Sequence, residues 1–262
     1  MKFAAVAIAL ALLQVQDPVK ERLEKSPRHL EWITIKHGER TVHAFIAFPE
    51  VKEKAPVVVL IHEIFGLSDW MRSMADQLAE RGYIAIAPDL LSGMGPKGGK
   101  TSDFENGDAV RAAIGKLPPD QVTADLNAVC DFAKKEPGGN GKVAVGGFCW
   151  GGAQTFRFAS NRADLSAAFV FYGRGIETAD EIAKIGCPVY GFYAENDRRV
   201  NDTIAKSQEL MKAAKKTFEP VTYTGGGHGF MRAGELNPKD EGNAKAREDA
   251  WKRWNELLTK LR

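Results

Sequence analysis

The chain has 262 residues, of which 44% are hydrophobic and 27% charged, as is typical of a folded soluble protein. This length is enough to bury a core without disulfides or structural metals. Lys and Arg number 36 and Asp and Glu 34, which gives a net charge of +2 and excludes the strong basic excess of most nucleic-acid-binding proteins. The three cysteines can form at most one disulfide, so a disulfide framework is excluded too.

The N-terminal segment reads MKFAAVAIALALLQVQ, with one lysine before an apolar run over 3–13. A run of this length matches the core of a signal peptide and is too short to span a bilayer. We therefore predict a signal peptide at 1–16 and one domain over 17–262, exported to the periplasm or secreted and free of the membrane after processing. The alternative is an apolar helix packed on the domain of a cytoplasmic protein.

The segment 31–48 alternates polar and apolar residues around 37–40, which predicts an antiparallel hairpin. Strands and helices are then predicted, in chain order, as a strand at 56–61, a helix at 69–81, a strand at 83–87, a loop at 92–101, two helices within 103–135 divided at Pro118-Pro119, a strand at 143–145, a helix at 150–160, strands at 165–171 and 189–193, a helix at 201–215, a strand at 220–224 and a helix at 243–261. Short apolar strands that alternate with helices indicate an α/β fold with a mostly parallel sheet covered on both faces.

The segment 142–152, KVAVGGFCWGG, places Cys149 between a strand and a helix in a G-x-C-x-G pattern. A nucleophile on such a sharp turn needs glycine two residues to either side, where side chains would collide with neighbouring backbone. The helix N-terminus is expected to lower the thiol pKa. The pattern predicts Cys149 as a nucleophile; the alternative is a small buried apolar residue.

A nucleophile of this kind needs a base and an acid that orients the base, in the chain order nucleophile, acid, histidine. His228 is the only histidine after Cys149 and follows three glycines, so it is the predicted base. The acid is expected on the loop after the strand at 189–193. Asp197 is the preferred candidate, with Glu195 and Asp202 as alternatives.

The tetrahedral oxyanion of such a reaction is stabilised by two backbone N–H groups. One belongs to the residue after the nucleophile, which is Trp150. The other comes from the loop after an earlier strand, and Ile64 in the segment 62–66 is the natural candidate.

Taken together, these motifs resemble the dienelactone hydrolase (carboxymethylenebutenolidase) family of the α/β-hydrolase superfamily over about residues 30 to 260. The resemblance rests on HEIFG at 62–66, PDL at 88–90, GFCWGG at 147–152, Asp197 with Val200, and HGF at 228–230.

The resemblance implies an α/β-hydrolase fold and a triad of Cys149, Asp197 and His228. It further implies that Glu63 contacts the resting thiol and that Arg232 holds a substrate carboxylate. The family's second carboxylate-binding arginine, just after Pro-Asp-Leu, is absent here, and Arg174 or Lys97 could replace it.

The resulting hypothesis is a monomeric hydrolase that cleaves a small-molecule ester or lactone, with or without a carboxylate, through a thioester. No cofactor, metal, nucleic acid or membrane partner is expected. The alternatives are a general carboxylesterase or acyl hydrolase on the same scaffold, and a non-catalytic binding protein that kept the fold.

Overall fold

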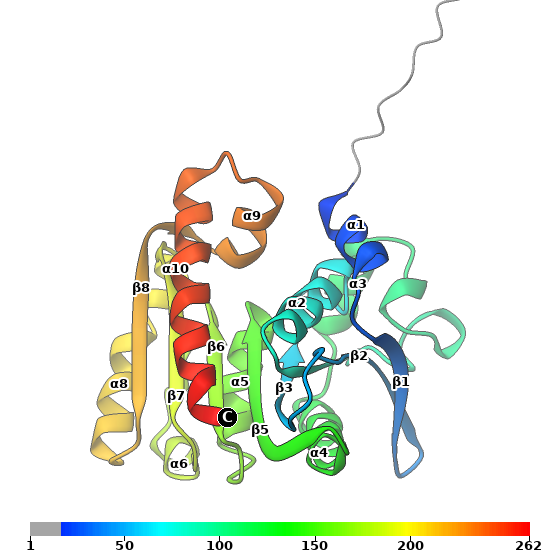
Figure 1. The fold of residues 1–262 in the computed structure, drawn as a ribbon. Coiled ribbons are helices and arrows are strands. Elements are labelled where there is room, and N and C mark those ends of the chain that lie inside the picture. Colours follow the sequence, from blue (N-terminus) through cyan, green and yellow to red (C-terminus); the bar gives the residue numbers. More distant parts are fainter. Residues whose placement is uncertain (1–16) are drawn as a thin grey trace, which may run out of the picture.

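The computed structural model describes residues 17–262, so the predicted signal peptide at 1–16 lies outside the described residues (Figure 1). Eight strands form one sheet in the order β1-β2-β4-β3-β5-β6-β7-β8. The strands are β1 (Leu30–His37), β2 (Arg40–Ala47), β3 (Ala55–Ile61), β4 (Ile84–Pro88), β5 (Gly139–Phe148), β6 (Ala167–Phe171), β7 (Val189–Asn196) and β8 (Phe218–Gly227).

Helices connect the strands and cover the sheet. The α-helices are α1 (Pro18–Lys25), α2 (Asp69–Glu80), α3 (Gly107–Ile114), α4 (Pro119–Lys135), α5 (Trp150–Ala159), α6 (Ala179–Ala183), α7 (Arg198–Asn201), α8 (Ile204–Ala213), α9 (Phe230–Leu236) and α10 (Glu241–Leu258). Three short 3-10 helices are η1 (Pro96–Gly98), η2 (Thr101–Asp103) and η3 (Thr259–Leu261).

The predicted α/β class is confirmed. Every residue of β3 and β4 is buried, because these apolar strands have a paired strand on either side and a layer of helices on each face. The predicted hairpin is also confirmed, since β1 and β2 pair antiparallel from Leu30 with Ala47 to His37 with Arg40. The remaining antiparallel pair is β2 with β4, and all pairs from β4 to β8 are parallel.

Two apolar cores lie on opposite faces of the sheet. One joins β3 and β5 to α4, α5 and α8, and includes Leu126, Phe156 and Met211. The other joins the opposite strand faces to α2 and α10, and includes Met74 and Trp254. Figure 1 shows α2 and α10 in front of the sheet. Within residues 17–262, no helix has the length and hydrophobicity needed to cross a membrane.

The helix predicted at 201–215 corresponds to α8, but its predicted start is wrong, because a break separates Asn201, the last residue of α7, from Ile204. The hydroxyl of Thr203 at the break donates to the carbonyl of Val200 and accepts from the N–H of Gly175. These side-chain hydrogen bonds compete with continuous helix. The short helices α1, α6 and α9 were not predicted.

The parallel strands all end at the same edge of the sheet, which lies at the top of Figure 1 where α9 follows β8. The last pair reaches furthest: β7 and β8 continue past a register irregularity to the pairing of Asn196 with Gly227. Because Asp197 and His228 come directly after these paired residues, the sheet brings an acid and a histidine together. Ligand sites of open α/β sheets characteristically lie at this edge.

Candidate active site

Cys149 occupies a strained turn between β5 and α5, with φ 56° and ψ −115°. A non-glycine residue in this region costs on the order of 1–3 kcal/mol, which the surrounding structure must offset. A Cβ at Gly147 would collide with the carbonyl oxygen of Gly151, and a Cβ at Gly151 would collide with that of Ile61. The predicted reason for glycine at both positions is therefore confirmed.

Hydrogen bonds connect Cys149, His228 and Asp197 in a row. The Nε2 atom of His228 lies 3.0 Å from the sulfur of Cys149, and its Nδ1 atom lies 2.5 Å from Oδ2 of Asp197. Asp197 is 6% exposed, whereas the His228 side chain is 33% exposed and reachable from solvent. The structure thus brings together the three side chains that the sequence singled out.

The two alternatives for the acid point elsewhere. Glu195 accepts a hydrogen bond from the N–H of Gly225 at 2.8 Å, and Asp202 lies 3.6 Å from the exposed Arg198. Among the described acidic side chains, Asp197 is the one hydrogen-bonded to His228.

Hydrogen bonding by the backbone N–H groups of Trp150 and Ile64 lowers the pKa of the Cys149 thiol. They are outweighed, because burial and the nearby Glu63 raise that pKa above its usual value. The expectation that the helix N-terminus depresses the thiol pKa is therefore wrong for the net effect. A thiol with a raised pKa needs a base to take its proton before it can attack.

Glu63 is hydrogen-bonded to Arg232, a contact that the resemblance does not imply. Its Oε2 atom accepts a 2.8 Å hydrogen bond from Nε of Arg232, while the thiol of Cys149 is hydrogen-bonded to His228. Glu63 is only 3% exposed, and burial raises its pKa to about 7 although Arg232 opposes the shift. Arg232, the predicted carboxylate-binding residue, thus already holds a carboxylate of the protein itself.

This buried carboxyl group predicts a pH-dependent stability. Between about pH 4.5 and 7 the folded state holds a proton on Glu63 that the unfolded state has released, so the free energy of unfolding falls as pH rises. Glu63→Gln removes this titration. The free energy of unfolding of the variant minus that of wild type should therefore be roughly 3 kcal/mol larger at pH 8 than at pH 4.5. Urea unfolding at both pH values measures this gain. Glu53→Gln, at an exposed position, is the control and should show no such pH dependence. The prediction would be contradicted if the difference in free energy of unfolding between Glu63→Gln and wild type were the same at both pH values.

His62, the first residue of the HEIFG motif, supports the loop that carries Ile64. Its Nδ1 donates to the carbonyl of Glu63 at 2.8 Å, and its Nε2 accepts from the N–H of Leu90 at 3.3 Å. The imidazole stacks on Trp150 with 5.5 Å between ring centroids, and burial lowers its pKa. A neutral imidazole therefore packs beside both residues whose N–H groups face the sulfur.

A cavity of about 440 Å³ opens over Cys149. Tyr172 lies in its wall with a buried hydroxyl that has no hydrogen-bond partner within residues 17–262, and its ring meets His228 edge-on at 5.3 Å. Sequence reasoning missed Tyr172, which has no motif beyond its place after β6. Three arginines also line the cavity: Arg174, Arg199 and Arg232. Lys97, the other suggested cation, is not among the lining residues.

The remaining thiols lie away from this cavity. Cys130 and Cys187 are buried and unbridged, and burial raises the pKa of each to about 12. In the part of the chain that the structure describes, no group of three or more His, Cys, Asp or Glu side chains is arranged to hold a metal ion.

Comparison with known proteins matches residues 42–261 to the dienelactone hydrolase family. A Salmonella typhi protein provisionally named carboxymethylenebutenolidase is 31% identical over 222 residues, which cover 80% of this chain and 79% of the relative. A similarly named Escherichia coli K12 protein is 29% identical over 209 residues, covering 76% of this chain and 74% of the relative.

Solved structures agree with these relatives. The crystal structure of a provisionally named dienelactone hydrolase from Klebsiella pneumoniae has a TM-score of 0.74 at 26% identity, covering 88% of this chain and 98% of its own. A dienelactone hydrolase-like promiscuous phosphotriesterase from metagenomic libraries has a TM-score of 0.73 at 22% identity, covering 89% and 98%. At that identity the second likeness shows the shared fold alone.

Proposed function

This chain belongs to the dienelactone hydrolase family and is a hydrolase, and from that premise we propose that it cleaves carboxylic esters or lactones through a thioester on Cys149. The observation that carries the proposal is the row of hydrogen bonds from Asp197 through His228 to the Cys149 sulfur, beside two converging backbone N–H groups. A nucleophile, an oriented base and oxyanion donors are the parts that acyl transfer requires.

In the first half of the reaction, Nε2 of His228 takes the thiol proton as the sulfur of Cys149 attacks the substrate carbonyl carbon. The negative charge that develops on the carbonyl oxygen is stabilised by the N–H groups of Ile64 and Trp150. The carbon–oxygen bond of the ester then breaks, and the leaving oxygen takes the proton from His228. The acyl group remains on sulfur as a thioester.

In the second half, His228 takes a proton from water as the water oxygen attacks the thioester carbon. The carbon–sulfur bond breaks, the sulfur recovers its proton from His228, and the carboxylic acid leaves. Asp197 accepts the Nδ1 hydrogen bond throughout and stabilises the transient imidazolium. For a lactone, the acid and the alcohol are two ends of one product.

Detection of the acyl-enzyme tests this mechanism. After rapid acid quenching of turnover with a 4-nitrophenyl ester, we expect mass spectrometry to find the acyl group on the peptide that contains Cys149. The peptides with Cys130 and Cys187 serve as internal controls, because these thiols are buried and lie outside the cavity. Turnover with the acyl group on any other residue would contradict the proposal.

The cavity arginines favour a substrate that carries a carboxylate. Glu63 already occupies Arg232, whereas none of the described carboxylates lies within 4 Å of a charged nitrogen of Arg199. Within residues 17–262, Arg199 therefore has no ion-pair partner although it lines the cavity over Cys149, and Arg174 is paired with Glu177 alone, at 3.6 Å. These two arginines are candidates to replace the one that is absent after Pro88-Asp89-Leu90.

This proposal predicts a substrate preference. We expect a 4-nitrophenyl ester whose acyl chain ends in a carboxylate to have a higher kcat/KM than the methyl-ended ester of the same length. Arg199→Met should reduce this preference roughly tenfold, the usual order for one charge-assisted hydrogen bond. Arg198→Met is the matched control, because Arg198 is 93% exposed and does not line the cavity. The role of Arg199 would be refuted if both variants lost the preference for the carboxylate-ended ester equally, or if wild type showed no such preference.

A further inference from the structure

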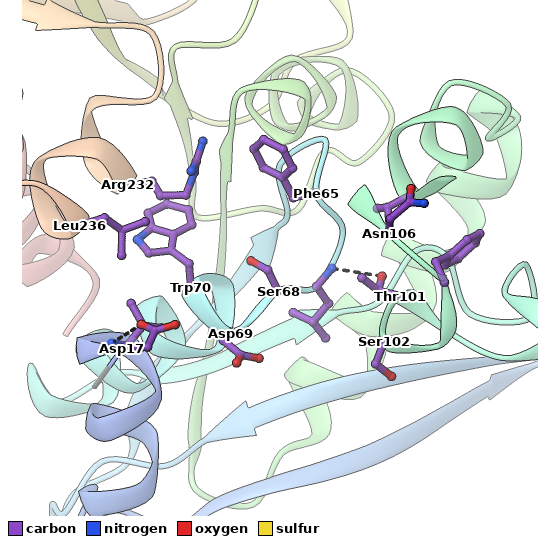
Figure 2. Close-up of a pocket in the computed structure, with 14 residues that line it drawn as sticks. Asp17, Phe65, Ser68, Asp69, Trp70, Thr101, Ser102, Asn106, Arg232 and Leu236 are labelled. Atoms are coloured by element: carbon purple, nitrogen blue, oxygen red, sulfur yellow. Dashed lines mark hydrogen bonds between the residues drawn. The ribbon is translucent and has the colours of Figure 1, made fainter. Parts of the chain in front are cut away.

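A second cavity, of about 490 Å³, lies beside the one over Cys149. Figure 2 shows Arg232 and Leu236 of α9 on one side of it, Ser102 and Asn106 on the other, and Ser68 to Trp70 at the start of α2 between them. Most of its wall is apolar and is formed by Phe65, Leu67, Trp70, Phe104, Val110 and Leu236.

Phe65 and Arg232 line both cavities, so the two cavities meet at these side chains. The guanidinium of Arg232 lies over the ring of Phe65, 4.6 Å from its centroid, and Glu63 holds Arg232 in place. Both side chains are partly exposed. A molecule attached to Cys149 therefore has an apolar space next to it, separated by a cation stacked on an aromatic ring.

The polar groups around the second cavity are already engaged. The indole N–H of Trp70 donates to Glu235 at 2.9 Å, and the hydroxyl of Thr101 donates to Asp89 at 2.7 Å. Asp69 is paired with Arg72, and Arg232, the cation that lines this cavity, is paired with Glu63. What remains available to a ligand is mainly apolar surface, including Leu236, which is 44% exposed.

We propose that the second cavity binds an uncharged apolar arm of the substrate, an alkyl or aryl group on the acyl or the alcohol side of the scissile bond. The inference rests on the proposed ester and lactone hydrolysis and defines its substrate class: an ester or lactone with a carboxylate toward the arginines and an apolar group beyond Phe65. Each methylene buried there should raise kcat/KM about threefold to fourfold until the space is full.

The test compares two series of uncharged esters, 4-nitrophenyl alkanoates and alkyl acetates, with chains of two to eight carbons. In wild type, kcat/KM should rise with chain length in at least one series. Leu236→Trp, which places an indole in the cavity, should lower the ratio of longest to shortest ester at least tenfold. Ser102→Trp should act likewise from the opposite wall. Val51→Trp is the matched control, because Val51 is 50% exposed and lines neither cavity.

The outcomes separate this inference from the proposed function. Hydrolysis of the shortest ester that depends on Cys149, without any rise along either series, would overturn the second cavity as a subsite and leave the mechanism standing. The subsite would be overturned in the same way if the ratio of kcat/KM for the longest ester to that for the shortest were equal in Leu236→Trp, Ser102→Trp and Val51→Trp. Failure to hydrolyse any ester would overturn both proposals. A ratio that falls only in the two cavity variants supports the subsite.

Discussion

Replacing Cys149 by alanine is expected to reduce ester hydrolysis by on the order of 10⁴-fold or more, because the variant lacks the atom that forms the thioester. The fold should persist, since the substitution removes one partly exposed sulfur and keeps the backbone hydrogen bond from Cys149 N–H to the carbonyl of Phe171. The measurements are kcat/KM for a 4-nitrophenyl ester and the thermal unfolding curve.

The matched control for this experiment is Cys187→Ala. It makes the same chemical change at a buried thiol outside the cavity over Cys149, so its kcat/KM should stay close to that of wild type. Wild-type activity in Cys149→Ala would refute the thioester mechanism. A loss of activity accompanied by a collapsed unfolding transition would instead show that the cysteine is needed for folding.

Asp197→Asn is expected to lower kcat by on the order of 10⁴-fold while preserving the shape of the site. The carboxylate accepts the Nδ1 hydrogen of His228, which leaves Nε2 free to take the thiol proton. An asparagine amide that donates to Nδ1 would favour the opposite tautomer, with a hydrogen on Nε2 facing the sulfur. This exchange matters more here because burial raises the pKa of the thiol, so the base must remove a proton.

The control is Asp202→Asn, a change of the same chemistry at the other end of the short helix α7. Asp202 pairs with the exposed Arg198 and not with His228, so its loss should alter kcat less than about threefold. Measuring kcat from pH 6 to 9 tests the tautomer explanation of a slow Asp197→Asn enzyme. A wrong tautomer lowers kcat across the whole range, whereas recovery of wild-type kcat at high pH would contradict the tautomer argument.

Much of the site could be predicted because its signals are local. The glycines around Cys149 mark a turn whose crowding depends on nearby backbone, and the structure shows that crowding at Gly147 and Gly151. His228 and Asp197 could be chosen because parallel strands end at one edge and the chain order limits the candidates. The strands at 56–61 and 189–193 were clear from their apolar residues, although β7 extends to Asn196.

The rest depends on contacts between distant parts of the chain. Glu63 and Arg232 are 169 residues apart, and no periodicity reveals that they pair. The net direction of the Cys149 pKa shift depends on burial and on the Glu63 charge, neither of which a helix-terminus argument contains. The break between α7 and α8 is set by Thr203 holding Gly175, a loop contact 28 residues away.

The extension of β7 and β8 beyond β6 determines where the enzyme can tolerate insertions and deletions. The nucleophile follows β5, an interior strand of the sheet, but the acid and the base follow the outermost pair, where β8 has β7 as its single strand neighbour. Arg253 of α10 ties these two strands together by donating to the carbonyls of Gly191 and Glu219. An insertion or deletion of one residue within β8 would turn His228 toward the opposite face, so the length of this border strand is fixed by the need to keep base and acid in contact.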